Sequence, residues 1–182
     1  MAVKMQPYGP LMVEHRLIER MVALMKKELE RIEKEKAVDT DFIISAAEFL
    51  RNYADKCHHG KEEDILFRSL LKKPISPEDK KMIDGFLSDH VLARKTVKDL
   101  LSGKDDFVSG NKKAVDRVID CLKRLTELYP AHIAREDRQF FIPCMRYFSD
   151  EEKAKMVEDF ANFDRTMDKS GYEKLVLRLE GL

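Results

Sequence analysis

Apolar residues recur every three or four positions through four long stretches of the chain, the spacing that places them on one face of an α-helix. The first stretch is predicted to begin after Pro10 and to run to about Glu35. The second covers about residues 39–71, and the third follows Pro77. The fourth runs toward Pro143 and carries Val115, Ile119, Leu122, Leu125 and Leu128. The pattern therefore predicts four amphipathic helices.

Turn and capping signals separate these helices. KKPISPED at residues 72–79 ends the second helix, and Ser76 with Asp79 forms a capping-box pattern that opens the third. SGKDDFVSGN at residues 102–111 is predicted to be the longest loop, with Asn111 as the N-cap of the fourth helix.

A fifth, mostly polar helix is predicted over about residues 149–169, opened by the capping-box pattern of Ser149 and Glu152. Four long amphipathic helices on short links favour an all-α fold, an antiparallel up-down-up-down four-helix bundle. We expect one domain over residues 1–182, with the bundle core at about 10–148 and an additional C-terminal helix packed across it. The composition agrees, since 43% hydrophobic and 37% charged residues with only 7 Gly and 6 Pro are typical of helix-rich globular proteins.

The positive and negative charges of the chain balance, with 34 Lys and Arg against 34 Asp and Glu. A neutral chain has no overall attraction to nucleic acid or to an anionic membrane. The first ten residues lack the apolar core of a signal peptide, and no apolar run is long enough to cross a bilayer. Cys57, Cys121 and Cys144 are odd in number and match no zinc pattern, which indicates reduced thiols. We therefore expect a cytoplasmic protein with neither nucleic acid nor membrane as a partner; the sequence identifies no protein partner.

A short repeat singles out candidate functional residues. HHGKEEDILF at residues 58–67 matches HIAREDRQFF at residues 132–141. The alignment pairs His58 with His132 and Glu62 with Glu136. In each copy the histidine precedes the glutamate by four residues, so both side chains project from one face of a helix.

His59 and Glu63 form an alternative pair with the same spacing. Aligning this pair with the second copy takes the final phenylalanines out of register. Periodicity also favours His58, which follows Ala54 by four residues on the apolar stripe, whereas His59 follows Asp55. We expect His58 to point inward, and His59 to lie outside the set of direct ligands.

The two remaining histidines also lie on apolar stripes. His15 stands among Leu11, Met12, Ile18 and Val22, and His90 among Ile83, Phe86, Leu87 and Val97. At a rise of about 1.5 Å per residue, the histidines of the second, third and fourth helices lie roughly 20 Å from the same end of the bundle. His15 lies at the same level as His58. Four histidines and two glutamates are therefore expected in one layer of the core.

Such a layer indicates a metal site. A lone core histidine is usually only hydrogen-bonded, and glutamates on a helix most often form surface ion pairs. Six such groups buried together without a cation would leave charges and donors unpaired, at a cost of several kcal/mol. Imidazole and carboxylate without thiolate suit iron or manganese and accept zinc. Two glutamates among four histidines are natural bridges between two cations. The predicted metal ligands are His15, His58, Glu62, His90, His132 and Glu136.

The order His, His-x-x-x-Glu, His, His-x-x-x-Glu on four successive helices resembles the hemerythrin-like, HHE cation-binding family. The similar motifs are EHRLIER, CHHGKEEDILF, DHVLARK and HIAREDRQFFIP, and the resemblance covers residues 10 to about 148. It implies an antiparallel four-helix bundle around two iron ions joined by an oxo or hydroxo bridge, with zinc or manganese as substitutes. It further implies that the four histidines are terminal ligands and that Glu62 and Glu136 bridge the ions.

Two departures from the oxygen-carrying hemerythrins bear on function. Those proteins have a second ligand histidine on the third helix, where this chain has Arg94 four residues after His90. They also place an aspartate five residues after the last histidine, where this chain has a glutamate at four. Reversible oxygen carriage is therefore not expected.

The resemblance implies binding, sensing or reaction with oxygen, nitric oxide or peroxide as the small ligand. The alternatives are an enzyme that detoxifies peroxide or repairs iron–sulfur clusters, and an iron store. A metal-binding or sensing protein is favoured over a dedicated enzyme, because the sequence has no residue pattern for an organic substrate. Glu19, His59 and Glu63 stay open as additional ligands.

Overall fold

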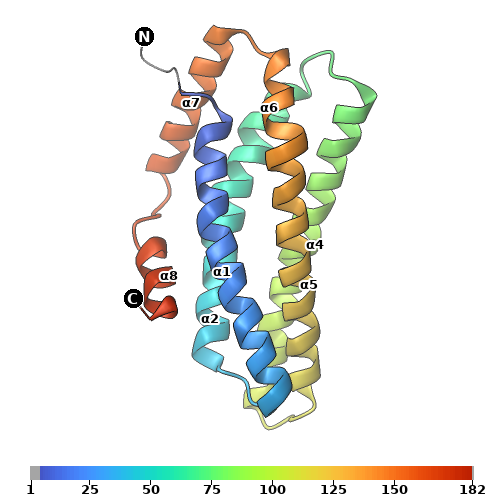
Figure 1. Ribbon diagram of the computed structural model, residues 1–182, viewed down its shortest axis with the longest axis vertical. Coiled ribbons are helices and arrows are strands. Elements are labelled where there is room, and N and C mark those ends of the chain that lie inside the picture. Colours follow the sequence, from blue (N-terminus) through green and yellow to red (C-terminus); the bar gives the residue numbers. More distant parts are fainter. Residues whose placement is uncertain (1–4, 182) are drawn as a thin grey trace.

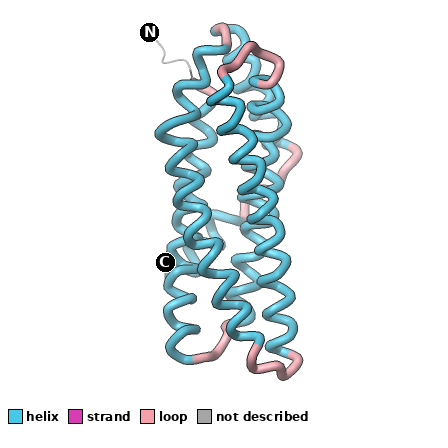
Figure 2. The backbone as a smooth tube through the Cα atoms, turned by 90° about the vertical axis from the view of Figure 1, so that its right-hand side faces the viewer, coloured by secondary structure: helices cyan, strands magenta, loops and turns pink. Residues whose placement is uncertain are grey.

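The computed structural model describes residues 5–181, and this part of the chain consists of helices and short links, with no strand (Figures 1 and 2). Four long helical stretches lie side by side along the long axis of the molecule (Figure 1). The links between successive stretches lie at alternate ends of the molecule (Figure 1). The chain is thus all-helical, as its hydrophobic periodicity predicts.

The first stretch is helix α1, Tyr8–Glu35. The helix begins three residues earlier than predicted, and Pro10 lies in its first turn, where the missing N–H of a proline has no helical partner to lose. Lys36 ends the helix in the left-handed conformation at φ 53°, and its N–H donates to the Ile32 carbonyl at 2.8 Å.

The second stretch is continuous from Thr40 to Leu70, close to the predicted bounds. It consists of helix α2, Thr40–Phe49, the π-helices η1, Leu50–His59, and η2, Glu62–Phe67, and helix α3, Arg68–Leu70. The carboxylate of Asp39 caps its start by accepting from two backbone N–H groups. The π-helical segments were not predicted.

The third stretch, helix α4, covers Pro77–Val108 and extends through most of the predicted loop at residues 102–111. The loop prediction is wrong because Gly103 is a packing residue. A Cβ there would lie 3.2 Å from Cδ of Arg117, so glycine lets the next helix approach closely. The N-cap of that helix is Lys113, not Asn111.

The fourth stretch runs from Ala114 to Tyr147. Its parts are helix α5, Ala114–Arg135, the π-helix η3, Glu136–Phe140, helix α6, Phe141–Cys144, and the 3₁₀-helix η4, Met145–Tyr147. The π-helical segment falls in the second copy of the sequence repeat, as η2 does in the first.

Two shorter helices follow, where one was predicted. Helix α7, Asp150–Arg165, begins at the predicted capping box of Ser149 and Glu152 but ends earlier than expected. Helix α8, Tyr172–Glu180, was not predicted. Both lie along one side of the long helices (Figure 1).

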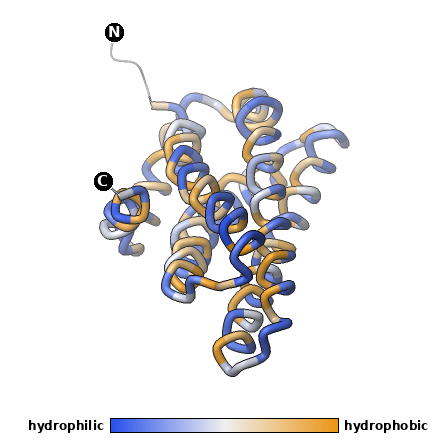
Figure 3. The backbone as a smooth tube through the Cα atoms, turned by 60° about the horizontal axis from the view of Figure 1, so that its bottom comes forward, coloured by the Kyte–Doolittle hydropathy of each residue, from blue (hydrophilic) through white to orange (hydrophobic). Residues whose placement is uncertain are grey.

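The buried apolar side chains form two clusters, one toward each end of the molecule. One cluster contains Phe86, Phe140 and Phe160, the last of which lies on helix α7. The other cluster contains Ile18 and Ile133. Hydrophobic and hydrophilic positions alternate along each long helix, as amphipathic packing requires (Figure 3). None of the helices between residues 5 and 181 combines the length and apolar character needed to cross a bilayer.

Candidate metal centre

A layer of buried polar side chains separates the two apolar clusters. Its members are at most 3% exposed, and they are His15, His58, His59, Glu62, His90, His132 and Glu136. The structure therefore brings together all six side chains predicted from the sequence and adds a fifth histidine. The layer lies between Phe86 of one cluster and Ala93 of the other on helix α4.

The π-helical segments explain why adjacent residues enter this layer. His58 and His59 lie in η1, Glu62 in η2 and Glu136 in η3. A π-turn holds more residues than an α-turn, so neighbouring side chains point in more similar directions. Both histidines of the dipeptide can thus face the core, which ordinary α-helical spacing disfavours. Short π-helical segments occur frequently at functional sites.

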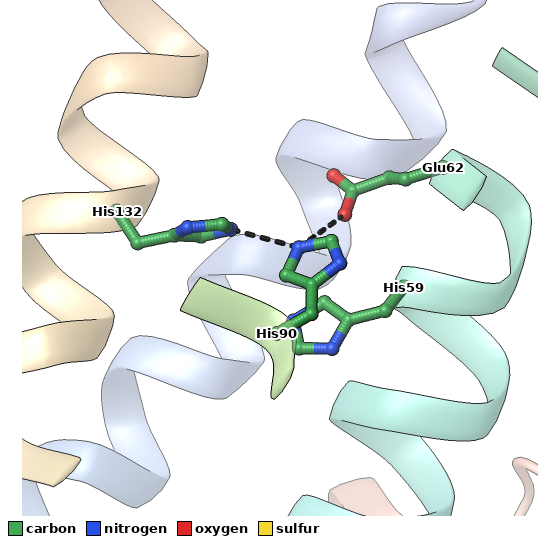
Figure 4. A group of neighbouring side chains, drawn as sticks. All are labelled: His59, Glu62, His90 and His132. Atoms are coloured by element: carbon green, nitrogen blue, oxygen red, sulfur yellow. Dashed lines mark hydrogen bonds and ion pairs between the residues drawn. The ribbon is translucent and has the colours of Figure 1, made fainter. Parts of the chain in front are cut away.

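The carboxylate of Glu62 stands between two histidines. Its Oε1 lies 3.2 Å from Nε2 of His58. Its Oε2 lies 3.4 Å from Nε2 of His90 (Figure 4). One carboxylate thus offers an oxygen to each half of the layer.

Glu136 repeats this arrangement with the other two histidines. Its Oε2 lies 3.3 Å from Nε2 of His15, and its Oε1 lies 3.2 Å from Nε2 of His132. The four histidines therefore form two pairs, His15 with His58 and His90 with His132, and each glutamate spans both pairs.

A second carboxylate holds the opposite nitrogen of every histidine. The Nδ1 contacts are His15 to Asp137 at 2.7 Å, His58 to Glu14 at 3.0 Å, His90 to Glu63 at 2.7 Å, His132 to Asp89 at 3.1 Å and His59 to Asp55 at 3.2 Å. Because a carboxylate accepts, each Nδ1 donates its proton outward, and in the four histidines paired with Glu62 and Glu136 it is Nε2 that faces the centre. Metal-binding histidines are oriented by carboxylates in the same way.

The atoms that face the centre have no other partners. Nε2 of His15 and of His58 and all four oxygens of Glu62 and Glu136 are buried and make no hydrogen bond within residues 5–181. Nε2 of His90 lies 3.2 Å from Nε2 of His132, and two lone pairs at that distance repel unless a cation or proton lies between them. The donor set fits metal cations, which would pair every one of these atoms.

The protonation of two histidines in the layer also indicates that the layer requires positive charge. Burial disfavours a charged imidazole, but the negative charge of Glu62 raises the pKa of His58 to about 10. Burial likewise opposes protonation of His132, and Glu136 nevertheless raises the pKa of that imidazole to about 9. In the metal-free protein, protons on these two rings therefore supply positive charge that cations would otherwise supply.

His59 lies beside the centre in a different orientation. Its ring stacks on that of His90, with centroids 3.7 Å apart and planes 11° from parallel (Figure 4). A ring-nitrogen lone pair lies in its ring plane, and two separated parallel planes share no point at which both could reach one ion. Although its nitrogen lies within 4.8 Å of ligand atoms of three neighbours, His59 does not coordinate together with His90 in this arrangement. His59 is buried and supports the ring of His90.

The other two open candidates also lie outside the donor set. Glu63 accepts from Nδ1 of His90 and from Nη2 of Arg94, the latter at 2.6 Å, so its carboxylate orients a histidine. Glu19 is 42% exposed and contacts Nε of Arg16 at 3.3 Å, the outer ion pair that its sequence position favours.

The carboxylates that orient these histidines were not predicted from the sequence. Each of the four histidines that contact Glu62 or Glu136 is held by an acid from the preceding helical stretch, where the fourth stretch counts as preceding the first. Glu14 of the first stretch holds His58 of the second, and Glu63 of the second holds His90 of the third. Asp89 of the third stretch holds His132 of the fourth, and Asp137 of the fourth holds His15 of the first. The sequence signal was present: two of them immediately precede a histidine of the layer, and the other two immediately follow Glu62 and Glu136.

A buried ion-pair network supports the layer from outside. Lys61 is 0% exposed, and its Nζ contacts Glu14 and, at 2.6 Å, Oδ1 of Asp164. Nζ of Lys169 lies 2.9 Å from Oε1 of Glu14, the carboxylate that holds His58. The ammonium groups of Lys61 and Lys169 thus connect the segment after helix α6 with Glu14, the carboxylate that holds His58.

Helix α7 also docks directly on the ligand-bearing helix. A Cβ on Gly60 would lie only 2.7 Å from Cζ of Phe163, so a larger residue there would push the ring of Phe163 away. Cys57 lies nearby with Glu14 and Asp164 as a second group of metal-binding residue types. Lys61 already neutralises both acids, and burial raises the pKa of the Cys57 thiol to about 11, so this group is an ion-pair network and not a metal site.

Comparison with known protein families agrees with this geometry. A family model described as the hemerythrin HHE cation binding domain matches residues 6–142, well over half of the 182-residue chain. No match was found among curated proteins or among solved structures. The matched range contains every metal-facing residue of the layer, from His15 to Glu136, and the layer supports the binding of metal cations. The chain therefore belongs to the hemerythrin family of HHE cation-binding domains.

Proposed function

We propose that the polar layer binds two iron ions. His15 and His58 would hold one ion, His90 and His132 the other, and Glu62 and Glu136 would bridge them. The convergence of partnerless Nε2 and carboxylate atoms carries this proposal, because every Nδ1 is already engaged by a carboxylate. Imidazole and carboxylate without thiolate match iron, with manganese and zinc as competitors.

Aromatic side chains keep water from one side of the layer. Phe141 stacks on His15 at 5.5 Å between ring centroids, and Phe86 meets His132 edge-on at 5.3 Å. Both phenylalanines are fully buried. A dry wall lowers the local dielectric and strengthens the attraction between the carboxylates and a bound cation.

Two iron ions in this layer would supply binding of, and reaction with, oxygen, nitric oxide or peroxide. The chain offers each ion two imidazoles and one oxygen from each glutamate, fewer donors than iron accepts, so a small molecule has room on both ions. Arg94 occupies the place of a further histidine and is engaged with Asp55 at 2.8 Å and Glu63 at 2.6 Å. Equal openness of the two ions favours reaction or sensing over reversible carriage.

The proposal also includes the fold topology and the cellular compartment of the protein. Links at alternate ends of the molecule support an antiparallel up-down-up-down four-helix bundle within one domain (Figure 1). Cys57, Cys121 and Cys144 are all buried and free, which supports a reducing compartment such as the cytoplasm.

The proposal predicts about two iron ions per chain in protein from an iron-replete host. Metal analysis and optical spectra measure this content. The reduced protein should bind nitric oxide and, when mixed with oxygen, should convert to a stable oxidised form. Zinc in place of iron would contradict the metal assignment, and an oxygen-induced spectrum that vanishes under vacuum would restore the carrier function.

Metal affinity should rise with pH between about 6 and 10. The pKa values of about 10 for His58 and about 9 for His132 lie above the ordinary 6.5, so both rings carry protons at pH 7 in the metal-free protein. A metal ion must displace these protons in order to bind. Raising the pH weakens the competition between protons and metal, and the gain in affinity ends once the pH exceeds both pKa values. Zinc titrations against a chelator at several pH values test this, with proton release measured in a weak buffer. A pH-independent affinity, corrected for the chelator, would show that the two rings are neutral.

A further inference from the structure

A cavity of about 630 Å³ lies between the second helical stretch and helix α4, beside the metal layer. This volume is in the range of cavities that hold small organic molecules. His59 and Tyr129 line it, and their rings stack 6.3 Å apart. Since His59 also stacks on His90, the cavity reaches to within one side chain of a metal-facing histidine.

The side walls of the cavity are apolar. They comprise Leu50, Ala93, Val97 and Leu101. Ala93 and Leu101 are separated by two turns of helix α4, about 12 Å. The walls therefore suit an elongated apolar body lying along the two helices.

Unpaired positive charge surrounds this apolar space. Arg51, Lys56 and Lys98 line the cavity with exposed side chains, and none of them forms an ion pair with any residue between 5 and 181. Cations of this kind favour an anionic group at the rim.

The carboxylates that line the same cavity are already paired. The pairs are Asp55 with Arg94, Asp105 with Lys104 and Asp106 with Arg117. Negative charge at the cavity is thus compensated within the protein, whereas the positive charge of the three cations is not.

Tyr129 adds a donor at the inner end. Its side chain is 3% exposed, and its hydroxyl makes no hydrogen bond with the described part of the chain. Burial and the nearby charge of Asp55 raise the pKa of this tyrosine, so the hydroxyl keeps its proton. Although the residue as a whole is buried, Tyr129 lines the cavity, where its free hydroxyl can pair with a ligand or with water.

We propose that this cavity binds an organic carboxylate with an elongated apolar body. The carboxylate pairs with Arg51, Lys56 and Lys98, and the far end of the molecule reaches Tyr129 beside the metal layer. This site goes beyond the proposed function, because it places an organic molecule next to the ions instead of a small gas or peroxide.

Calorimetric titration of the full-length, iron-loaded protein with decanoate tests the proposal. We expect one saturable site per chain, with decanol and acetate binding at least about tenfold more weakly, because each lacks either the charge or the apolar body. The Arg51→Glu/Lys98→Glu variant should lose at least about tenfold in decanoate affinity. The Lys81→Glu/Lys95→Glu variant, with the same charge change on exposed lysines of α4 outside the cavity, should bind as the parent does.

A cavity-filling change supplies an independent readout. Val97→Phe should abolish decanoate binding, and the surface charge variants keep the test decisive if this variant does not fold. Equal affinity for decanol, or unchanged affinity after charge reversal at the rim, would overturn the proposal. Iron content measured in parallel separates the two sites: a chain that holds iron but no decanoate overturns only this inference, and the converse overturns only the metal proposal.

Discussion

Replacing His58 with alanine is expected to lower the iron content from about two ions per chain to less than one. Nε2 of His58 faces Oε1 of Glu62 at 3.2 Å, and its Nδ1 is held by Glu14. The ion proposed on this side would therefore keep only one of its two imidazoles, that of His15. Metal analysis after dialysis against a mild chelator measures the loss.

The neighbouring histidine is the matched control. His59→Ala should retain most of the iron, because the ring of His59 lies parallel to that of His90 and does not aim a lone pair at the same point. The two variants delete the same side chain from adjacent positions of one helix. If His59→Ala emptied the site while His58→Ala left it full, the assignment of the inward histidine would be reversed.

Replacing Lys61 with alanine is expected to lower the free energy of unfolding by about 3 kcal/mol. The ammonium of Lys61 is fully buried between Glu14 and Asp164, and its removal leaves two carboxylates undercompensated. The loss stays at the lower end of the usual range because Lys169 still contacts both acids. Chemical denaturation of the metal-free protein at pH 7 measures it, and the thermal midpoint should fall by roughly 6–12 °C.

Lys56→Ala is the control for this change, because Lys56 is exposed on the same helix and should cost less than about 0.5 kcal/mol. Acid should reduce the effect of Lys61→Ala. Burial alone would raise the pKa of Glu14, but His58 and Lys61 hold it well below the ordinary 4.5. The stabilisation from this carboxylate is therefore complete above pH 4.5 and is lost as the pH falls further. A loss below about 1 kcal/mol at pH 7 would show that the network does not hold the C-terminal segment in place.

Much of the candidate centre could be predicted from residue type and spacing. The repeat at residues 58–67 and 132–141 and the apolar spacing around His15 and His90 selected six side chains, and the structure places all six in one buried layer. Helical periodicity sufficed because the rise per residue fixes the height of each side chain along a bundle. The metal and its reactivity stay proposals.

Local sequence signals predicted the secondary structure less well where contacts between distant segments of the chain decide it. Gly103 reads as a loop residue, since glycine lowers helix propensity, yet it lies within helix α4 because the next helix passes close to its backbone. Helix α8 was missed as well, although Val176 is fully buried against the long helices. In both cases packing between distant segments overrides the local preference.

The sequence by itself determined the all-helical class, the family and the six inward side chains, because each of these follows from residue type and spacing along one helix. Only the tertiary structure decided which acid orients which histidine, since every such pair joins neighbouring helical stretches. It also decided the place of His59, which π-helical winding turns into the core where α-helical spacing predicts a flank. Contacts between helices depend on how the helices approach one another, and the periodicity of a single helix carries no information about that approach.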